Sequence, residues 1–289
     1  MSFRETKNPR LTRRGFLKLI GAMGAGTLAY MAGIESSDLD VVQMSLTLPR
    51  LDRAFSGFRM VQISDLHMGS WMNRERLAVV VDAVLAEKPD LVAITGDFVA
   101  GGRRESWYSD KLADLLAELA RLSEEIPTVA VMGNHDHIAG VSLVRNMLAE
   151  ANIVELPNTV FSIERGDSQL HFCGVDDVLY GDPNLVDLLY QVPESGAAIL
   201  LAHEPDFADI SASAKRFDLQ ISGHSHGGQV VLWDDFKPLL PRFGEKYPSG
   251  LYKVDEMLQY TNRGLGMSHV NVRFNCPPEM TVFTFYPAI

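Results

Sequence analysis

Side chains of the kinds that bind metal ions occur at five places in this sequence, each directly after a short apolar run. The five groups are Asp65-Leu66-His67, Gly96-Asp97, Gly133-Asn134-His135-Asp136, His203-Glu204-Pro205 and Gly223-His224-Ser225-His226. Five of the eight histidines belong to them. Carboxylate, amide and imidazole ligands together favour a divalent transition metal such as Mn, Fe, Zn or Co over Ca or Mg alone. Because no Cys is among them, a structural zinc finger is excluded.

The elements that must position these side chains alternate between strand and helix in the first half of the chain. The sequence predicts strands over 58–64, 90–95 and 128–132 and helices over 74–87, 109–125 and 141–151. This order predicts an α/β fold with helices outside a sheet. Ligand groups in such folds collect at the carboxyl ends of the strands, which is where these groups lie.

The second half is richer in predicted strands. They cover 159–163, 169–175, 197–202, 218–222, 229–233, 250–254, 258–261, 270–274 and 280–285, with helices over 184–190 and 207–214. The sequence contains no internal repeat and no low-complexity linker. We therefore expect one domain over residues 35–289, in which two packed sheets are flanked by helices.

The first 34 residues differ from the rest in charge. They carry six basic residues and one acid, whereas residues 35–289 carry 20 basic and 36 acidic residues. Arg13-Arg14, followed by an almost uncharged run over 19–34, is typical of a twin-arginine export signal. We expect residues 1–34 to be recognised by the twin-arginine export machinery, as a signal peptide or as a signal anchor. An ordinary amphipathic or anchoring helix is the alternative.

Export would place the protein in the periplasm or cell envelope, either soluble or tethered at a membrane surface by the N-terminal segment. The 16-residue run would span about 24 Å as a helix, against about 30 Å of bilayer hydrocarbon, so a spanning helix would be marginal. The acidic remainder of the chain is unsuited to nucleic acid, because phosphate contacts require clustered Lys and Arg. No nucleic-acid partner is expected.

Taken in order, the five groups resemble the calcineurin-like metallophosphoesterase superfamily, over about residues 58–285. The strings Gly223–Gln229, Asn262–Gly266 and Arg273–Glu279 are similar to its exported or membrane-associated bacterial branch, the YkuE- and YaeI-like phosphoesterases. The resemblance implies a four-layer α-β-β-α sandwich, in agreement with the two-sheet prediction. It also implies a phosphoester substrate and two divalent transition-metal ions, Mn, Fe or Zn.

The resemblance assigns a role to each motif residue. One metal ion would be bound by Asp65, His67, Asp97 and His226, and the second by Asp97, Asn134, His203 and His224. Phosphodiester or phosphomonoester bonds would be hydrolysed by direct attack of metal-bound hydroxide. His135 would serve the leaving oxygen as general acid or charge stabiliser. Asp136 would either orient the His135 imidazole or cap a helix.

One departure from the family pattern concerns the phosphate. In the protein-phosphatase branch a second Asp and an Arg follow the bridging Gly-Asp, whereas Ala100 stands here in place of that Asp. Arg103 and Arg104 lie just beyond and could contact phosphate or simply be exposed. This departure argues against a Ser/Thr protein phosphatase.

The remaining histidines and the cysteines receive simpler interpretations. His171 alternates with apolar residues and is predicted to lie on the surface, and His137 could orient a ligand or cap a helix. His269 could reach the mouth of the site. Cys173 and Cys276 are expected to be buried free thiols rather than a disulfide.

The substrate is left open by the sequence. A broad phosphodiesterase or phosphomonoesterase is one possibility. A UDP-2,3-diacylglucosamine-type pyrophosphatase acting on a nucleotide-linked lipid is another, and several aromatic residues could favour it: Trp107, Tyr108, Phe236, Phe243 and Tyr247. A nuclease is disfavoured by the acidic charge. A metal-binding sensor or scaffold is disfavoured because every expected ligand position is filled.

Overall fold

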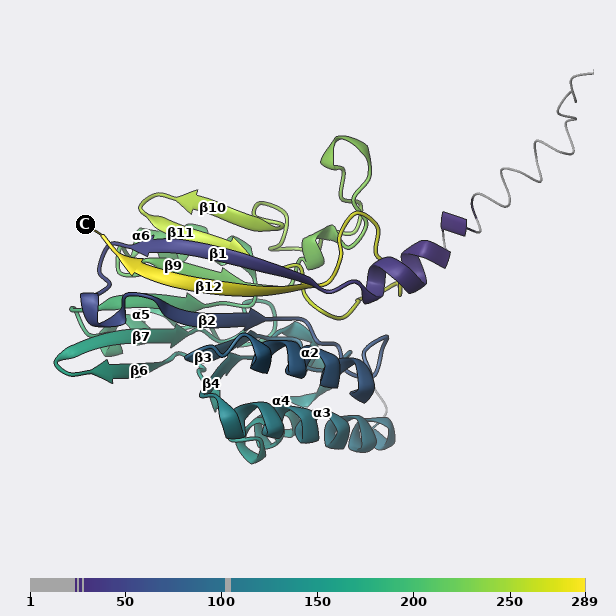
Figure 1. The fold of residues 1–289 in the computed structure, drawn as a ribbon, viewed down its shortest axis with the longest axis horizontal. Helices are drawn as coiled ribbons and strands as arrows, with labels where there is room; N and C mark the ends of the chain where they lie inside the picture. The colour runs from purple at the N-terminus through teal and green to yellow at the C-terminus, as the bar shows by residue number, and fades with distance from the viewer. Residues whose placement is uncertain (1–23, 25, 28, 102–104, 289) are drawn as a thin grey trace, which may run out of the picture.

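The computed structural model describes residues 24, 26–27, 29–101 and 105–288, and it consists of two six-stranded sheets packed face to face (Figure 1). Arg103, Arg104 and most of the predicted signal segment lie outside the described residues. Among those that are described, no helix has both the length and the apolarity that crossing a bilayer requires.

The first sheet runs in the order β1-β12-β2-β3-β4-β5. Its strands are β1 (Asp40–Leu48), β12 (Glu279–Pro287), β2 (Phe58–Ile63), β3 (Leu91–Thr95), β4 (Thr128–Val131) and β5 (Val154–Glu155). Strands β2 to β5 are parallel, and β12 is antiparallel to β2. Because β1 is parallel to β12, the start of β1 lies at the same edge as the carboxyl end of β2.

The second sheet runs in the order β10-β11-β9-β8-β7-β6. Its strands are β10 (Gly250–Val254), β11 (Met257–Thr261), β9 (Leu219–Ser222), β8 (Ala197–Leu201), β7 (Ser168–Gly174) and β6 (Thr159–Arg165). The four strands from β11 to β7 are parallel, and the two edge strands are antiparallel to their neighbours.

Three apolar layers hold the sandwich together. Strand β2 contributes to two of these layers from its opposite faces. Met60 packs between the two sheets, whereas Val61 and Ile63 pack between the first sheet and its helices. The helices on the first sheet are α2 (Arg74–Ala86), α3 (Glu105–Glu125) and α4 (Asn134–Glu150), and those on the second are α5 (Leu185–Gln191) and α6 (Ala208–Ser213). Both faces of each sheet are thus covered, which explains the continuous apolar runs of β3 and β8. The predicted four-layer α-β-β-α fold is confirmed.

Several details differ from the sequence predictions. The predicted strands over 229–233 and 270–274 are wrong, because their only pairing is an isolated bridge between Val230 and Phe274. Strand β1 was not predicted, since it is an edge strand whose residues are mostly exposed. Helix α4 begins at Asn134 rather than at 141, and Gly140 interrupts it with a φ of 129°.

His171 was predicted to be on the surface and is instead fully buried. Its Nδ1 is 2.7 Å from Ser162 Oγ and its Nε2 is 2.9 Å from the Ser195 carbonyl, so both ring nitrogens have partners. Burial lowers the pKa of this imidazole. The period-two pattern misled the prediction because helices cover the outer face of this sheet.

Candidate metal centre

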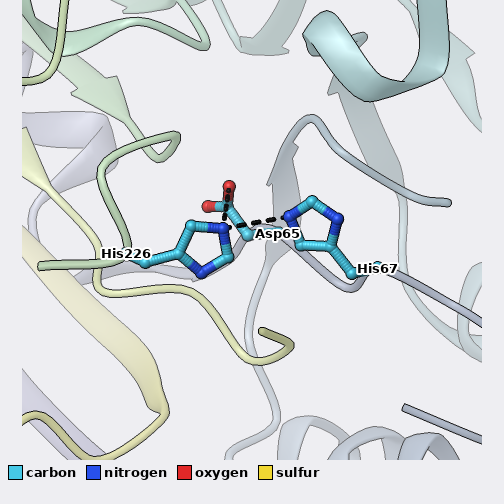
Figure 2. Close-up of side chains that lie close together, drawn as sticks. All are labelled: Asp65, His67 and His226. Atoms are coloured by element: carbon cyan, nitrogen blue, oxygen red, sulfur yellow. Dashed lines mark hydrogen bonds and ion pairs between the residues drawn. The ribbon is translucent and has the colours of Figure 1, made fainter. Parts of the chain in front are cut away.

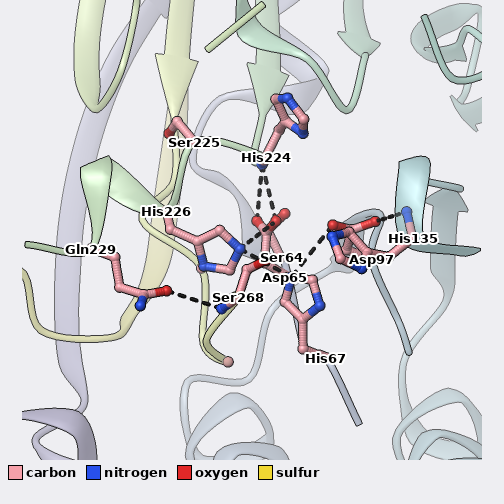
Figure 3. Close-up of polar contacts among 12 residues, drawn as sticks. Ser64, Asp65, His67, Asp97, His135, His224, Ser225, His226, Gln229 and Ser268 are labelled. Carbon is pink, nitrogen blue, oxygen red and sulfur yellow. Dashed lines mark hydrogen bonds and ion pairs between the residues drawn. The ribbon is translucent and has the colours of Figure 1, made fainter. Parts of the chain in front are cut away.

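All five motif groups meet at one end of the sandwich, beyond the carboxyl ends of β2, β3, β4, β8 and β9. Figure 3 shows residues of four of these groups together: Asp65, His67, Asp97, His135, His224 and His226. Asp65 and Asp97 each stand two residues after their strands, and Asn134 opens α4. The carboxylates and imidazoles named as ligands are nearly or fully buried: Asp65, His67, Asp97, His203, His224 and His226. The structure therefore brings these six side chains together.

Left-handed backbone conformations aim these side chains. Positive φ angles occur at Asp65 (52°), His67 (46°), Asp97 (56°), His224 (68°) and His226 (52°). Such conformations cost a non-glycine residue of order 1–3 kcal/mol each and cluster at functional sites. The surrounding fold therefore holds five strained residues around one point.

Two glycines allow the ligand loops to approach each other. A Cβ on Gly133 would lie 2.4 Å from Asp97 Oδ1, and a Cβ on Gly223 would lie 1.9 Å from Ser64 Oγ. Backbone hydrogen bonds then connect the loops, from Asp65 N to the Gly96 carbonyl (2.9 Å) and from Gly223 N to the His203 carbonyl (3.0 Å). A side chain at either glycine would push these loops apart.

One half of the site consists of Asp65, His67 and His226 (Figure 2). His67 Nε2 and His226 Nε2 are 3.0 Å apart, and Asp65 Oδ1 is 3.5 Å from His226 Nε2. Burial lowers the pKa of His67 to about 3 and that of His226 well below its usual value, so both rings are neutral at pH 7. Burial raises the pKa of Asp65 to about 6.

The other half consists of Asn134, His203 and His224. His203 Nδ1 is 2.6 Å from the Thr95 carbonyl, and His224 Nε2 is 2.9 Å from the Arg242 carbonyl. Since a carbonyl only accepts, these nitrogens carry the proton. The opposite nitrogens converge on Asn134 Oδ1, at 3.3 Å for His203 Nε2 and 3.0 Å for His224 Nδ1. Metal-ligating histidines characteristically donate their outer N–H to such a carbonyl.

Asp97 lies between the two halves. Its Oδ2 is 3.4 Å from both His67 Nε2 and His203 Nε2, and its Oδ1 accepts from His135 N at 2.8 Å. Burial alone would raise the pKa of Asp97, but the neighbouring histidines, His203 above all, outweigh burial and lower it well below the usual value. Burial disfavours protonation of His203, yet the charge of Asp97 raises its pKa well above normal. A bound cation would replace that proton as the partner of Asp97.

His135 and Asp136 have different surroundings. The His135 ring lies 4.7 Å from the His67 ring and is half-buried. It lines the pocket that opens above the ligands, here named the catalytic pocket. The Asp136 carboxylate accepts hydrogen bonds from Gly133 N (3.0 Å) and Val99 N (3.2 Å). Asp136 therefore caps α4 and fixes the turn that presents Asn134 and His135.

The pocket above the ligands has a mostly polar wall. Its lining includes Ser225, Gln229, Leu239, Pro241, Ser268 and His269. The expectation that His269 reaches the mouth agrees with this lining. Gln229 Oε1 accepts from Ser268 N at 2.9 Å and Gln229 Nε2 donates to the Val270 carbonyl at 2.5 Å, so Gln229 holds this loop in place.

Arg273 is a supporting residue whose role the sequence did not predict. Its guanidinium is fully buried and donates to the carbonyls of Arg263, Gly264 and Gly266, at 3.0, 2.9 and 2.6 Å. A Cβ on Gly264 would lie 2.7 Å from Asp65 Cβ, so this loop packs directly against Asp65. Because the acceptors are backbone carbonyls, which every residue has, the sequence does not reveal that Arg273 binds them.

The other predicted positions lie outside the ligand set or are only partly described. His137 pairs with Asp176 at 3.0 Å, and both cysteines are buried and free, as expected. Tyr247 is buried and donates its hydroxyl to Asp209 at 2.8 Å. The side chains of Trp107 and Tyr108 lie outside the described part of the chain.

The chain is similar to several known proteins. The sequence profile of the calcineurin-like phosphoesterases matches residues 58–228. The metallophosphoesterase YkuE of Bacillus subtilis is 30% identical over 95% of this chain and 98% of its own length. Phosphodiesterase YaeI of Escherichia coli is 28% identical over 94% of this chain and 98% of its own. Among solved structures, TT1561 of Thermus thermophilus aligns with a TM-score of 0.48 and 14% identity, over 73% of this chain and 91% of that one.

The donor set suits a metal ion, because imidazole nitrogens, an amide oxygen and two carboxylates converge in a buried space. Two of these histidines have their outer nitrogens fixed by carbonyls, and two face each other at 3.0 Å. The profile match covers more than half of the chain and includes every one of the five motif groups. The chain therefore belongs to the calcineurin-like phosphoesterase family and is a metal-dependent hydrolase of phosphoester bonds.

Proposed function

We propose that this chain is a dinuclear phosphodiesterase of the cell envelope. The observation that carries the proposal is the position of Asp97 between two sets of converging ligands, at 3.4 Å from a histidine of each set. The first cation would be held by Asp65, His67, Asp97 and His226, and the second by Asp97, Asn134, His203 and His224. Bound there, two divalent cations would supply an activated water at neutral pH and positive charge for the phosphoryl oxygens.

In this proposal the other steps of the reaction depend on residues of the chain itself. The ligands hold their geometry through the strained loops and the carbonyl-fixed histidines, so little reorganisation is needed on binding substrate. His135 is not a ligand in this proposal, and its half-buried ring lines the pocket. It orients the ester and gives a proton to the leaving oxygen. Asp136 acts on His135 only through the turn that it caps.

The composition of the pocket favours a diester. None of the described residues that line the pocket is Lys or Arg, so among these residues the imidazoles of His135 and His269 are the groups outside the proposed ligand set that could carry positive charge towards phosphate. A phosphodiester carries one negative charge and a monoester close to two at neutral pH. The name of the YaeI relative, a phosphodiesterase, agrees with this preference.

A nucleotide-linked lipid is the second candidate substrate, with pyrophosphate cleavage as the reaction. Leu239 and Pro241 give one side of the pocket an apolar wall, and Phe236 on the same loop is 54% exposed. The remaining lining is polar, which favours the simple diester. Twin-arginine export, which the proposal adopts for residues 1–34, also counts against a substrate made on the cytoplasmic side.

The test is hydrolysis of bis-p-nitrophenyl phosphate beside p-nitrophenyl phosphate by metal-stripped protein, with Mn, Zn, Fe or Mg added back. We expect metal-restored turnover that is faster on the diester. Asp97→Asn should lower it by about 10³-fold, the scale of losing a central electrostatic group. Asp255→Asn, an exposed carboxylate in a turn, is the matched control and should leave turnover unchanged. Faster monoester cleavage, or full activity in Asp97→Asn, would refute the proposal.

A further inference from the structure

The N-terminal segment joins the body at the edge that carries the metal centre. Strand β1 starts there, as its pairing with β12 requires. Just before it, the Met31 carbonyl accepts from Arg273 N at 3.1 Å, and Glu35 Oε1 accepts from Cys276 N at 2.7 Å. The uncharged run over 19–34 therefore ends on the loop 273–276. Figure 1 shows its described part, which includes the helical turn η1 (Tyr30–Ile34) and is called the N-terminal helix below, leaving the body at that end.

A second loop is fastened to the same place. Residues 230–241, here named the apolar loop, are joined to loop 273–276 by the hydrogen bond from Val231 N to the Phe274 carbonyl, at 2.8 Å. Three large apolar side chains of this loop are exposed: Trp233 by 75%, Phe236 by 54% and Leu239 by 38%. In Figure 1 the loop projects from the body on the side where the N-terminal helix leaves.

The apolar loop has a defined shape and little net charge. Hydrogen bonds from Leu232 N to the Phe236 carbonyl and from Phe236 N to the Trp233 carbonyl close it. Lys237 Nζ lies 2.6 Å from Asp235 Oδ1, so its charge is paired. Leu239 also lines the catalytic pocket, which means that whatever covers the loop lies at the mouth of the active site.

An apolar groove lies beside the same N-terminal segment. Its lining includes Arg76 and six apolar residues: Leu39, Trp71, Met72, Val79, Val80 and Leu265. Val79 is 63% exposed. Ser37, close to the end of the N-terminal segment, also lines this groove. Two apolar features thus accompany the point where the uncharged run enters the body.

We propose that the apolar loop and the apolar groove form a membrane-docking face that seats in the headgroup region of a phospholipid bilayer. Trp, Phe and Leu are the side chains that favour this region. A bilayer fits better than a protein partner because the uncharged run, itself suited to an apolar medium, enters beside both features. The catalytic pocket would then open at headgroup depth, so the substrate would be an amphiphile with its phosphoester at the membrane surface. This substrate class rests on the proposed phosphodiesterase function.

The charge of the molecule predicts which lipids suffice. Residues 35–289 carry 20 basic and 36 acidic residues, so anionic lipids offer no general attraction. Docking by apolar side chains needs no lipid charge. Binding to uncharged, zwitterionic phosphatidylcholine should therefore be sufficient and insensitive to salt.

The first test places the full chain in phosphatidylcholine vesicles and reads Trp233 alone, in a Trp71→Phe/Trp107→Phe variant. Brominated acyl chains should quench its emission. The control adds Trp233→Phe and Tyr190→Trp, moving the reporter to an 86% exposed position on α5. Because α5 leads directly into β8, its end lies at the opposite edge of the sheet, and no quenching is expected there. Unquenched Trp233, or Trp233 shielded in a lipid-free dimer, would overturn the proposal.

The second test compares two diesters: water-soluble bis-p-nitrophenyl phosphate and p-nitrophenyl dodecyl phosphate embedded in the vesicles. Trp233→Ser/Phe236→Ser, which leaves the described pocket lining intact, should lose turnover on the embedded diester only. Equal loss on both substrates would overturn the docking role. If the unaltered protein hydrolyses neither diester, the phosphodiesterase proposal fails, and quenching still decides whether the face docks.

Discussion

The two halves of the metal centre are supported differently. His203 and His224 each give their outer nitrogen to a backbone carbonyl, of Thr95 and Arg242 respectively. The outer Nδ1 atoms of His67 and His226 are buried and have no hydrogen-bond partner among the described residues. A buried polar atom without a partner costs roughly 1–3 kcal/mol. In one half the outer histidine nitrogens are fixed by hydrogen bonds. In the other half the Asp65 carboxylate accepts from His224 N at 3.1 Å, but the outer histidine nitrogens have no such partner among the described residues. We therefore expect the half with His203 to bind its cation more tightly.

The largest expected effect separates turnover from binding. His135→Ala should lower kcat by about 10²–10⁴-fold, the usual contribution of a positioned proton donor, while both halves keep their metal. Diester hydrolysis and metal content by plasma mass spectrometry check this together. Equal loss of activity and of bound metal would show that His135 is itself a metal ligand and that the two ligand sets are assigned wrongly.

The next prediction tests the difference between the halves directly. His203→Ala should weaken the tighter binding step by at least about 10²-fold, since disturbing even the outer partner of a ligand costs about 10–100-fold. His67→Ala should weaken only the looser step. Calorimetric titration of Mn²⁺ into metal-stripped protein resolves the two steps. The comparison breaks if His67→Ala abolishes the tighter one.

A smaller effect should follow from the glycine beneath His135. Gly101 has a φ of 41°, and a Cβ there would lie 2.6 Å from His135 Nδ1. Gly101→Ala should displace the imidazole and lower kcat by about 10-fold, because small misplacements of a reacting group are expensive. Both metal-binding steps should stay unchanged in the calorimeter. Gly57→Ala is the control, at positive φ with open space around it.

The smallest effect concerns stability outside the metal centre. Burial disfavours the charge on Asp176, but the hydrogen bond from His137 and backbone amides outweigh it and lower the pKa of Asp176 to about 2. The same hydrogen bond raises the pKa of His137. The stabilisation of the folded state by protonated His137 is complete below the unfolded pKa of about 6.5 and is lost as pH rises through the raised folded pKa. The stabilisation by ionised Asp176 is instead lost as pH falls towards 2.

His137→Ala should therefore lower the free energy of unfolding by about 1 kcal/mol near pH 5, the scale of a partly solvated ion pair, because the two side chains are 8% and 18% exposed. The difference should shrink at alkaline pH, above the raised pKa of His137. Urea unfolding of the metal-stripped protein at both pH values measures it. A difference that does not change with pH would show that the ion pair is not its source.

Most of the candidate ligands could be predicted from the sequence because the strands that precede them are buried. Strands β2, β3, β4, β8 and β9 are covered on both faces, so each reads as an apolar run whose end marks a ligand group. Strand β1 gave no such run, since it is an edge strand and its pairing partner β12 lies far along the chain. The burial of His171 depends on the helices packed over the outer face of its sheet, and the acceptors of Arg273 are backbone carbonyls of residues 263–266. Neither is visible in the local pattern of side chains.

The insertion of β12 between β1 and β2 has a consequence for the order of events during synthesis. Of the described strands, β1 is made first and β12 last, and β1 pairs with β12 alone. While a ribosome is still extending the chain, β1 has no strand to join, and the segment before it is not yet bound to the catalytic edge. Pairing across so long a separation is also slow to form. The N-terminal segment can therefore take its final position only after β12 has been translated and the first sheet is complete.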